Sequence, residues 1–319
     1  MTVYGALDIG GTKIAGALLD GKGRLLARAQ RATPADRPAA DLAAAVMKVL
    51  DDLAAFPAWD ELSCMGIASA GPVDTDAGTV SPVNIPGWRG FPLIDLVRTH
   101  PRLPLSVLPV LVGDAVAMTA AEHWLGAARG FDNALCMVVS TGVGGGLVLG
   151  GRVHAGRTGN AGHIGHITVD HEGPRCACGA PGCVESLASG TAIAAHARAL
   201  GWTAEPGSPS HAAAVAAAAR EGDERALAAF RRSARALAAA IAATAALVEL
   251  DRVVIGGGVA QAGDVLFSPL RQYLDDYAVL DFTRGFSVVP AGLALNAGLI
   301  GAAATASAET VSPAGIPHC

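Results

Sequence analysis

Glycine-rich turns follow three short apolar segments of the chain. Segments 3–9, 134–139 and 253–255 are β-prone and apolar, and each runs into glycines. Backbone amides can approach a bound anion only where no Cβ stands in the way. We therefore predict a phosphate-binding α/β fold whose strand-to-turn junctions are Gly10-Gly11, the run from Thr141 to Gly146, and Gly256-Gly257-Gly258.

A carboxylate, Asp114, follows another apolar run, residues 108–112. A carboxylate at the end of a hydrophobic strand is costly unless it faces a cleft. In phosphoryl transfer the protein mainly positions groups and neutralises charge, and one carboxylate accepts the proton of the attacking hydroxyl. Asp is also a common N-cap at a strand-to-helix junction. From these residues alone, a catalytic base and a helix cap are equally good interpretations of Asp114.

Three of the six cysteines, Cys176, Cys178 and Cys183, lie within eight residues. They fit a reducing compartment if they are reduced or bound to a metal. The first residues lack a basic region and Asp8 interrupts the apolar run, so we expect no signal peptide and a cytoplasmic protein. No segment reaches the roughly 18 apolar residues that a membrane span needs.

The apolar spacing also predicts the elements that must position these residues. Residues 14–19 resume the strand pattern, and Gly21-Lys22-Gly23 predicts a hairpin turn. The remaining expectations are a strand over 24–29, a helix over 41–55, a strand over 65–70, a helix over 115–125, Ala-rich helix over 210–250 interrupted near Gly222, and loops at 206–209 and after 308. No internal sequence repeat is apparent.

Length and composition set the class of protein. A chain of 319 residues suits two domains of moderate size. Its 51% hydrophobic and 16% charged residues indicate a well-packed globular protein. The net charge of −5 argues against a nucleic-acid partner, which would normally require a basic patch. A small-molecule ligand is the expected partner.

Taken in order, the motifs resemble those of the ROK family of bacterial sugar kinases and repressors. The resemblance begins with Asp8-Ile9-Gly10-Gly11-Thr12-Lys13 and covers nearly the whole chain. The other matching elements are Ala70-Gly71-Pro72, Asn84-Ile85-Pro86-Gly87-Trp88, Asp114-Ala115, Thr141-Gly142-Val143-Gly144-Gly145-Gly146, Ala161-Gly162-His163-Ile164-Gly165-His166, Cys176 to Glu185, and Gly256-Gly257-Gly258-Val259. A chance match of all these elements in order is negligible.

The resemblance implies two actin-like (ribonuclease H-like) α/β domains with ATP and sugar in the cleft between them. The small domain would be residues 1–114 with a C-terminal helix over about 297–319, and the large domain residues 115–296. Repressors of the family carry a DNA-binding helix-turn-helix before the first phosphate motif. Here that motif begins at Asp8, which favours a kinase. A homo-oligomer, dimer or tetramer, is also implied.

The resemblance assigns roles to single residues. Asp114 would be the general base, and Asp8 would hold Mg²⁺ through water, since a hard oxygen ligand suits that ion. Lys13 would contact phosphate or be solvated. The other nucleotide contacts would be Gly10, Gly11, Thr12, Thr141 and Gly142 around the phosphates and Gly256, Gly257 and Gly258 beside the adenosine. Asn84 is interpreted as a structural loop residue.

The sugar and metal sites come from the same resemblance. Gly71 and Glu185 would serve the sugar, although Glu185 could also be a solvated loop residue. His166, with Cys176-x-Cys178-x4-Cys183, is similar to the family's zinc signature. Thiolate and imidazole ligands favour tetrahedral Zn²⁺, and four protein ligands leave no open position, so the ion would be structural. His166 would also contact the sugar. The alternative is three buried free thiols.

Two positions depart from the pattern. ROK sugar kinases usually have Asn before the catalytic Asp, where this chain has Gly113, and Glu three residues before the zinc His, where it has His163. In the family both side chains serve the 3-hydroxyl side of the sugar. Gly113 opens space, and His163 replaces an obligate anion with a ring that can accept or donate a hydrogen bond. A neutral filler or a spare metal ligand are the other interpretations of His163.

The expected function is ATP-dependent phosphorylation of a hexose or amino-hexose, at the 6-hydroxyl. The changed C3 side fits a 3-amino sugar such as kanosamine, because a site built for one polar group rejects another strongly. Glucose, N-acetylmannosamine and N-acetylglucosamine remain alternatives. A non-catalytic sugar sensor or pseudo-kinase would not need Asp8 and Asp114 together with phosphate loops.

Overall fold

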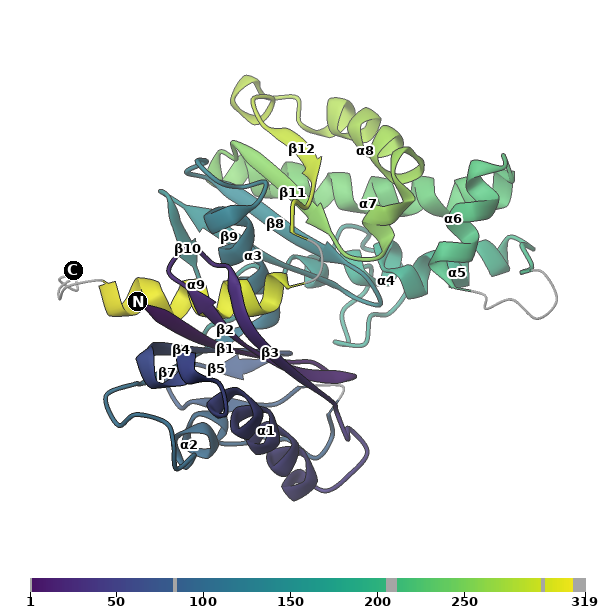
Figure 1. Ribbon diagram of the computed structural model, residues 1–319. Helices are drawn as coiled ribbons and strands as arrows, with labels where there is room; N and C mark the ends of the chain where they lie inside the picture. The colour runs from purple at the N-terminus through teal and green to yellow at the C-terminus, as the bar shows by residue number, and fades with distance from the viewer. Residues whose placement is uncertain (1, 83–84, 205–210, 294–295, 312–319) are drawn as a thin grey trace. The chain divides into compact units, whose positions relative to one another are not determined.

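The computed structural model describes residues 2–82, 85–204, 211–293 and 296–311, and the chain forms two compact units (Figure 1). Unit 1 consists of Met1–Gly126, Ala155–Ala161 and Leu295–Cys319, and unit 2 of Ala127–His154 and Gly162–Ala294. Three expectations from the sequence concern residues outside the described ones, namely Asn84, the loop at 206–209 and the end of the C-terminal helix at 312–319.

The boundaries of the two units differ from the domain boundaries expected from the sequence. Helix α3 (Asp114–Leu125) belongs to unit 1 because it packs against α9 (Ala297–Val311), where a Cβ on Gly301 would overlap the carbonyl of Ala117. Residues 155–161 also belong to unit 1. They do so because the Asn160 side chain donates to the carbonyl of Val73 at 2.7 Å and accepts from its N–H at 3.2 Å.

Unit 1 is built on a five-stranded sheet of order β3-β2-β1-β4-β7. Its strands are β1 (Val3–Ile9), β2 (Lys13–Asp20), β3 (Leu25–Ala32), β4 (Leu62–Ser69) and β7 (Pro109–Gly113). β1 and β2 pair antiparallel, as do β2 and β3, whereas β1 pairs parallel with β4, and β4 with β7. A two-stranded ribbon, β5 (Val73–Asp74) and β6 (Thr79–Val80), lies apart from this sheet.

Helices cover both faces of this sheet (Figure 1). On one face, α1 (Ala39–Ala54) buries Leu42, Val46, Val49, Leu50 and Leu53, whose helical spacing forms one apolar stripe. α2 (Leu93–Arg98) and the 3-10 turn η1 (Pro57–Glu61) complete this core. The other face is covered by α9, which approaches so closely that a Cβ on Gly66 of β4 would overlap the Ala302 carbonyl. A larger residue at Gly66 cannot be accommodated.

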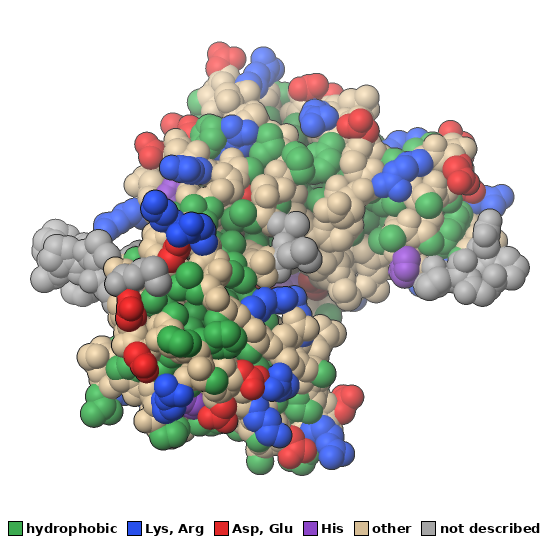
Figure 2. All heavy atoms as spheres, viewed as in Figure 1, with side chains coloured by type: hydrophobic (Ala, Val, Ile, Leu, Met, Phe, Trp, Pro, Cys, Tyr) green, Lys and Arg blue, Asp and Glu red, His purple; other side chains and the backbone are tan. Residues whose placement is uncertain are grey.

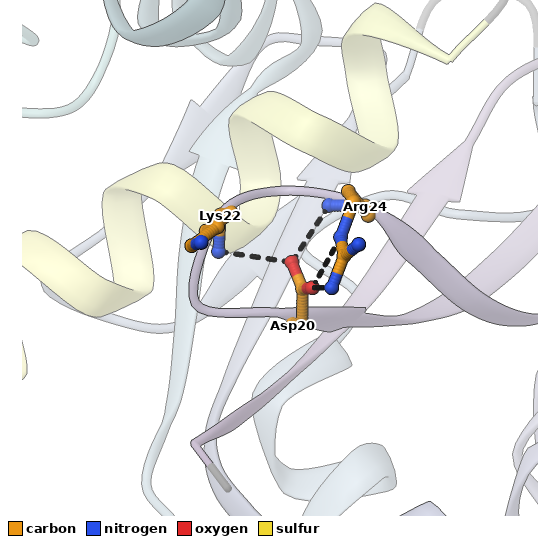
Figure 3. Close-up of polar contacts among 3 residues, drawn as sticks. All are labelled: Asp20, Lys22 and Arg24. Carbon is orange, nitrogen blue, oxygen red and sulfur yellow. Dashed lines mark hydrogen bonds and ion pairs between the residues drawn. The ribbon is translucent and has the colours of Figure 1, made fainter.

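The hairpin between β2 and β3 is closed by one buried carboxylate (Figure 3). Asp20 Oδ1 accepts hydrogen bonds from the backbone N–H groups of Lys22 and Arg24, both at 2.9 Å. Its Oδ2 pairs with the Arg24 guanidinium at 2.7 Å. These hydrogen bonds, first those from Arg24, lower the pKa of Asp20 although burial opposes them. The turn predicted from the glycines is therefore also fixed by Asp20.

Unit 2 has a second five-stranded sheet, of order β10-β9-β8-β11-β12. Its strands are β8 (Ala134–Val139), β9 (Val143–Leu149), β10 (Arg152–His154), β11 (Arg252–Gly256) and β12 (Ser287–Pro290). β8 pairs antiparallel with β9, and β9 with β10, whereas β8 pairs parallel with β11, and β11 with β12. The pairing pattern is that of unit 1, so one topology occurs twice in the chain.

Unit 2 contains both alanine-rich helices and helices with little or no alanine. They are α4 (Val184–Ala188), α5 (Gly190–Ala199), α6 (Ala212–Arg220), α7 (Glu224–Val248) and α8 (Asp264–Tyr277), with 3-10 turns η2 (Ile164–His166), η3 (Val259–Ala262) and η4 (Asp281–Thr283). The predicted interruption near Gly222 is confirmed, since this residue has φ +90° between α6 and α7. Asp223 then starts α7 by accepting from the N–H groups of Arg225 and Ala226.

On the face drawn in Figure 2, basic and acidic side chains are interspersed, so neither sign of charge dominates that face. Within the described ranges, no helix combines the length and apolar character that a membrane crossing requires.

Candidate active site

The predicted phosphate-binding turn of unit 1 joins β1 to β2. It contains Gly10, Gly11 and Thr12, and Thr33 holds it from the next strand. The Thr33 hydroxyl donates to the carbonyl of Gly10 at 2.6 Å, and its N–H donates to the carbonyl of Thr12 at 3.0 Å. The turn is thereby fixed through its carbonyl groups.

The corresponding turn of unit 2 joins β8 to β9 and is shorter than predicted. It spans only Ser140, Thr141 and Gly142, because β9 already begins at Val143. The glycines at 144–146 therefore lie in a strand and not in a loop. Close packing explains Gly145, since a Cβ there would lie 2.7 Å from Ile164 of η2 and 3.0 Å from the Cys136 carbonyl oxygen.

The third glycine-rich turn follows β11 and contains Gly256, Gly257 and Gly258. Gly257 has φ +89°, and a Cβ there would overlap the carbonyl of Val139, the last residue of β8. Only glycine fits this position. Its place against the end of β8 brings the predicted adenosine turn next to the Thr141–Gly142 turn within unit 2.

Asp8 lies on β1 close to the unit 1 turn. Helix α9 leaves room for its carboxylate, since a Cβ on Gly298 would lie 2.5 Å from Asp8 Oδ2. Burial raises the pKa of the Asp8 carboxyl, an effect that Lys13 opposes and the Asp114 carboxylate strengthens. The ionised form thus lacks sufficient positive charge nearby. A divalent cation would supply it, so the residues fit the predicted Mg²⁺ site.

Asp114 is the first residue of α3 and is exposed. Its Oδ1 accepts a hydrogen bond from the N–H of Ala115 at 2.7 Å. The helix begins with Gly113 as its N-cap, so Asp114 is not the capping residue of the alternative interpretation. Its carboxylate therefore lies among the first backbone N–H groups of α3.

Gly113 has an ordinary backbone conformation, with φ −68° and ψ 149°. A Cβ there would lie 3.6 Å from the Gly159 carbonyl oxygen, a normal contact distance. Neither backbone nor packing at Cβ requires glycine, so its effect is to leave space beside Asp114.

Asn160 is a residue that the sequence analysis missed. Besides pairing with Val73, its Oδ1 would lie 4.0 Å from a Cβ on Gly71. The neighbouring Gly159 approaches Gly113. Residues 159–160 therefore lie beside both Gly71 and Gly113, which were assigned to the sugar. Their position just before the Ala161-Gly162-His163 motif was the only available signal.

The four predicted zinc ligands come together. The ligand atoms of His166, Cys176, Cys178 and Cys183 all lie within 4.8 Å of one another. Cys178 Sγ is 3.6 Å from Cys183 Sγ, and Cys176 Sγ is 3.7 Å from His166 Nδ1. A tetrahedral zinc ion requires separations of about 3.8 Å between sulfurs and about 3.5 Å between sulfur and nitrogen. The residues present therefore fit Zn²⁺.

The thiols of this cluster differ in acidity. The backbone of Ala180, and then Cys183, lower the pKa of the exposed Cys178 by hydrogen bonding. Burial, and then the neighbouring cysteines, raise the pKa of Cys183 to about 12. A cation that binds as a thiolate complex must displace the Cys183 proton, so metal uptake would release protons.

His163 lies next to the metal cluster without joining it. Among the described residues, the group that could hold a metal includes His166 and not His163. The two rings stack at a centroid distance of 6.1 Å and an interplanar angle of 20°. The side chain of His163 is exposed. The geometry therefore gives no support to the interpretation of His163 as a spare ligand.

Glu185 lies in the first turn of α4, two residues after the last cysteine. It is half-buried, so it is not a solvated loop residue. Its Oε2 accepts a hydrogen bond from the N–H of Val143 at 2.9 Å. A residue assigned to the sugar thus contacts the backbone of a turn assigned to phosphate.

Each unit therefore gathers its own part of the predicted site. In unit 1, the predicted residues lie at the ends of three neighbouring parallel strands of one sheet. Asp8 and the Gly10–Lys13 turn lie at the end of β1, Gly71 lies after β4, and Asp114 follows β7. In unit 2, the two glycine-rich turns, Glu185 and the metal cluster surround the ends of β8 and β11. The segment from Ile167 to Cys183, which carries the three cysteines, is called the metal loop below. Turn amides, carboxylates and this loop are a set that suits phosphoryl transfer to a polar acceptor.

Known proteins match this chain along nearly its full length. The model of the ROK family matches residues 4–309. A glucokinase of Thermotoga maritima is 35% identical over 311 residues, covering 93% of this chain and 95% of that protein. An N-acetylmannosamine kinase of Yersinia pseudotuberculosis is 41% identical over 258 residues, covering 81% of this chain and 83% of that protein.

A solved structure agrees with these sequence matches. The ROK family glucokinase of Streptomyces griseus, in complex with glucose and AMPPNP, is 33% identical to this chain with a TM-score of 0.79. The match covers 96% of this chain and 99% of that one. The repeated sheet topology is accordingly the two-domain actin-like fold. With its motifs in order and a family match over residues 4–309, this chain belongs to the ROK family.

Proposed function

We propose that this ROK protein is an ATP-dependent sugar kinase that phosphorylates the 6-hydroxyl of a hexose or amino-hexose with Asp114 as general base. The observation that carries the proposal is the Asp114 carboxylate, exposed at the start of α3 directly after β7. It accepts the proton of the sugar hydroxyl while that oxygen attacks the γ-phosphorus of ATP. The bond to the departing ADP breaks as the new phosphate ester forms.

The nucleotide is assigned to the glycine-rich turns. Backbone amides of Gly11, Thr12, Thr141 and Gly142 bind the phosphates, and Gly256 to Gly258 pack beside the adenosine. Gly10 shapes the first turn instead, because its N–H donates to the Lys13 carbonyl at 3.0 Å. Asp8 would hold Mg²⁺ through water, and its partly buried carboxylate, with room left by Gly298 of α9, supports a cation at this position. The ion neutralises charge on the transferring phosphate when bound.

Zinc is assigned a structural role. The fit of His166, Cys176, Cys178 and Cys183 to a tetrahedron supports it, and four protein ligands leave the ion no position for substrate. The ion holds the loop that carries His166 and leads into α4, where Glu185 lies. Both residues contact the sugar in this proposal, together with Gly71.

The C3 side of the sugar is assigned to Gly113 and His163. Gly113 leaves space beside Asp114 that the backbone does not require. The imidazole ring of His163 can accept a hydrogen bond from an amine or a hydroxyl through a nitrogen that carries no proton. The combination favours a sugar modified at C3, such as a 3-amino sugar of the kanosamine type.

An acceptor screen tests the proposal directly. The protein is incubated with Mg-ATP and a panel of glucose, N-acetylmannosamine, N-acetylglucosamine and 3-amino-3-deoxyglucose, and the phosphorylated carbon is located by NMR. We expect phosphate on O6 and the highest kcat/KM for the 3-amino sugar. Sugar binding without phosphorylation of any acceptor would instead show a sensor. A preference for glucose or N-acetylmannosamine would correct the substrate alone.

The proposal also covers the cellular compartment and the oligomeric state of the enzyme. ATP and reduced thiols are both available in the cytoplasm, which suits this active site and the cysteine cluster. A homo-oligomer is expected, and sedimentation of the purified protein would measure its size.

A further inference from the structure

Glu185 rests directly against the phosphate-binding turn of unit 2. Its Oε2 accepts the N–H of Val143 at 2.9 Å, and a Cβ on Gly142 would lie 2.5 Å from the same oxygen. Gly142 leaves the room that this carboxylate occupies. Among the residues that the structure describes, none donates a hydrogen bond to the other oxygen, Oε1. One oxygen is thus committed to the turn, and the other is available.

The turn is held from its carbonyl side by helix α5. The N–H of Gly190 donates to the Ser140 carbonyl at 2.7 Å, and the Thr191 hydroxyl donates to the Thr141 carbonyl at 3.0 Å. Within the described part of the chain, no group accepts from the N–H of Thr141 or Gly142. Two adjacent donors therefore remain for an anion.

Glu185 is itself fixed by the metal loop. It follows Cys183, whose neighbour Val184 donates its N–H to the Ile167 carbonyl at 3.0 Å. Gly165 of η2 packs on the carbonyl of Val143, where any Cβ would overlap it. Val143 is therefore contacted by η2 through its carbonyl and by Glu185 through its N–H.

We propose that Glu185 is a positioning residue for nucleotide binding, which fixes the Ser140–Val143 turn so that its free amides face the ATP phosphates. This role rests on the proposed function and is additional to the contact that Glu185 makes with the sugar. A single carboxylate then serves both substrates, with Oε2 on the nucleotide turn and Oε1 toward the sugar.

The direction in which nucleotide affinity changes when the charge of Glu185 is removed distinguishes this positioning role from simple electrostatic repulsion. A carboxylate near a phosphate site repels the phosphates, so its loss would tighten nucleotide binding if charge alone mattered. If the carboxylate orders the turn, its loss weakens binding. Glu185→Gln keeps an acceptor oxygen for Val143 but removes the charge, whereas Glu185→Ala removes both.

The experiment measures nucleotide affinity in the absence of sugar, so that the sugar contact has no influence. Calorimetry with Mg²⁺ and adenylyl imidodiphosphate compares the wild type with both variants. We expect Glu185→Ala to weaken binding about tenfold or more and Glu185→Gln to stay within about threefold. Glu172→Ala, an exposed glutamate in the same metal loop, is the matched control and should leave affinity unchanged. Thermal unfolding and bound zinc are measured for every variant.

A double-mutant cycle tests the contact itself. Gly142→Ala places a methyl group 2.5 Å from Glu185 Oε2 and should weaken nucleotide binding in the wild-type background. In the Glu185→Ala background the conflict is gone, so the same change should cost severalfold less. Equal fold-changes in both backgrounds would show that Glu185 does not act through this turn.

The outcomes separate the two levels of the proposal. If the wild type binds nucleotide and Glu185→Ala binds it equally well or more tightly, the positioning role is overturned and the kinase function stands. If the wild type neither binds nucleotide nor phosphorylates a sugar, the proposed function is overturned and this role with it.

Discussion

Gly113 and Asp114 form the junction between β7 and α3, and only one of them carries a side chain. The first helical turn places the Asp114 carboxylate on the N–H of Ala115. At Gly113, an Asn side chain could begin at a normal contact distance of 3.6 Å from the Gly159 carbonyl oxygen. The backbone would therefore tolerate the residue that kinases of the family usually have there.

Restoring the family residues should move the substrate preference toward unmodified glucose. The variants are Gly113→Asn, His163→Glu and the double change, assayed by kcat/KM for glucose and 3-amino-3-deoxyglucose. Each recovered hydrogen bond contributes about 0.5–1.5 kcal/mol, or up to about 3 kcal/mol if charged. The double variant should therefore shift the ratio by roughly tens- to hundreds-fold.

The two changes should be non-additive because both groups serve the same substrate atom. Zinc content and thermal stability serve as controls, since His163 lies beside the ligand His166. A wild type that already prefers glucose, with an unchanged ratio in the double variant, would remove both residues from substrate selection.

Asp114→Asn should abolish turnover while sugar binding is largely retained. Loss of a proton acceptor typically costs about a hundred- to ten-thousand-fold in rate. Steady-state kcat and calorimetric sugar affinity are the two measurements. Asp41→Asn, another exposed aspartate in a first helical turn, is the matched control and should keep full activity. An Asp114→Asn variant within a few-fold of the wild-type rate would exclude Asp114 as the base.

At the scale of elements, the metal loop replaces regular structure. From Ile167 to Cys183 the chain forms no helix or strand, and α4 and η2 on either side are short. Such a segment has little apolar burial of its own to offset its conformational entropy. A bound ion would supply that stabilisation, because ligand binding to the folded form is also folding free energy.

Cys178→Ser should therefore lose zinc and stability together. Metal analysis of protein purified without chelator should find one zinc per wild-type chain and less than one in the variant. The melting temperature should fall by roughly 2–4 °C for each kcal/mol lost. Cys64→Ala, a buried cysteine of unit 1 outside the cluster, should keep its zinc. Zinc-free wild-type protein, or unchanged stability in Cys178→Ser, would contradict the structural role.

The β2–β3 hairpin makes a prediction about acid stability. The pKa of Asp20 is lowered in the folded state, so its stabilising contribution is present above the unfolded value of about 3.9 and is lost as pH falls through the folded value. Asp20→Asn should therefore be less stable than the wild type near pH 7, and the gap should narrow below about pH 4.

Urea unfolding of both proteins between pH 7 and pH 3.5 measures this gap. Asp74→Asn provides the comparison, because Asp74 also accepts a turn N–H, from Ala77 at 3.0 Å, but is exposed. A gap between wild type and Asp20→Asn that stays constant with pH would exclude an ionised Asp20 as its cause.

Elements with a clear apolar period were predictable from the sequence, and those shaped by close packing were not. The strand over 3–9 and the helix over 115–125 match β1 and α3 to within one residue. In β9, by contrast, the glycines gave no strand signal, and the small size of Gly145 serves the packing of η2. Residues 155–161 join unit 1 through Asn160, a long-range pairing that no local pattern reveals.

For the whole molecule, the repeated topology was not visible in the sequence. Both sheets begin with three antiparallel strands, to which two parallel strands are added. The core of unit 1 relies on Leu and Val from α1, whereas that of unit 2 relies on alanines of α7. Side chains of different volume fill the cores of the two units. The chain therefore repeats a topology without repeating a sequence pattern.

The repeated topology explains where the candidate site lies within each unit. The first hairpin of each unit carries a predicted phosphate turn, at Gly10–Thr12 in one and Thr141–Gly142 in the other. The ordered motifs were sufficient to predict the turns and to select four residues, His166, Cys176, Cys178 and Cys183, whose ligand atoms lie within 4.8 Å of one another. The contact of Glu185 with Val143 could not be predicted, because it joins residues 42 positions apart through a backbone amide.

The close fit of α9 against Gly66 and Ala117 has a consequence for synthesis of the chain. The strands of unit 1 precede unit 2 in the chain, yet one layer over their sheet is supplied by residues 297–311, which follow unit 2. Unit 2 contains no segment later than residue 294. During synthesis the sheet of unit 1 therefore lacks α9 on one face until residues 297–311 have been made, whereas unit 2 can be completed earlier.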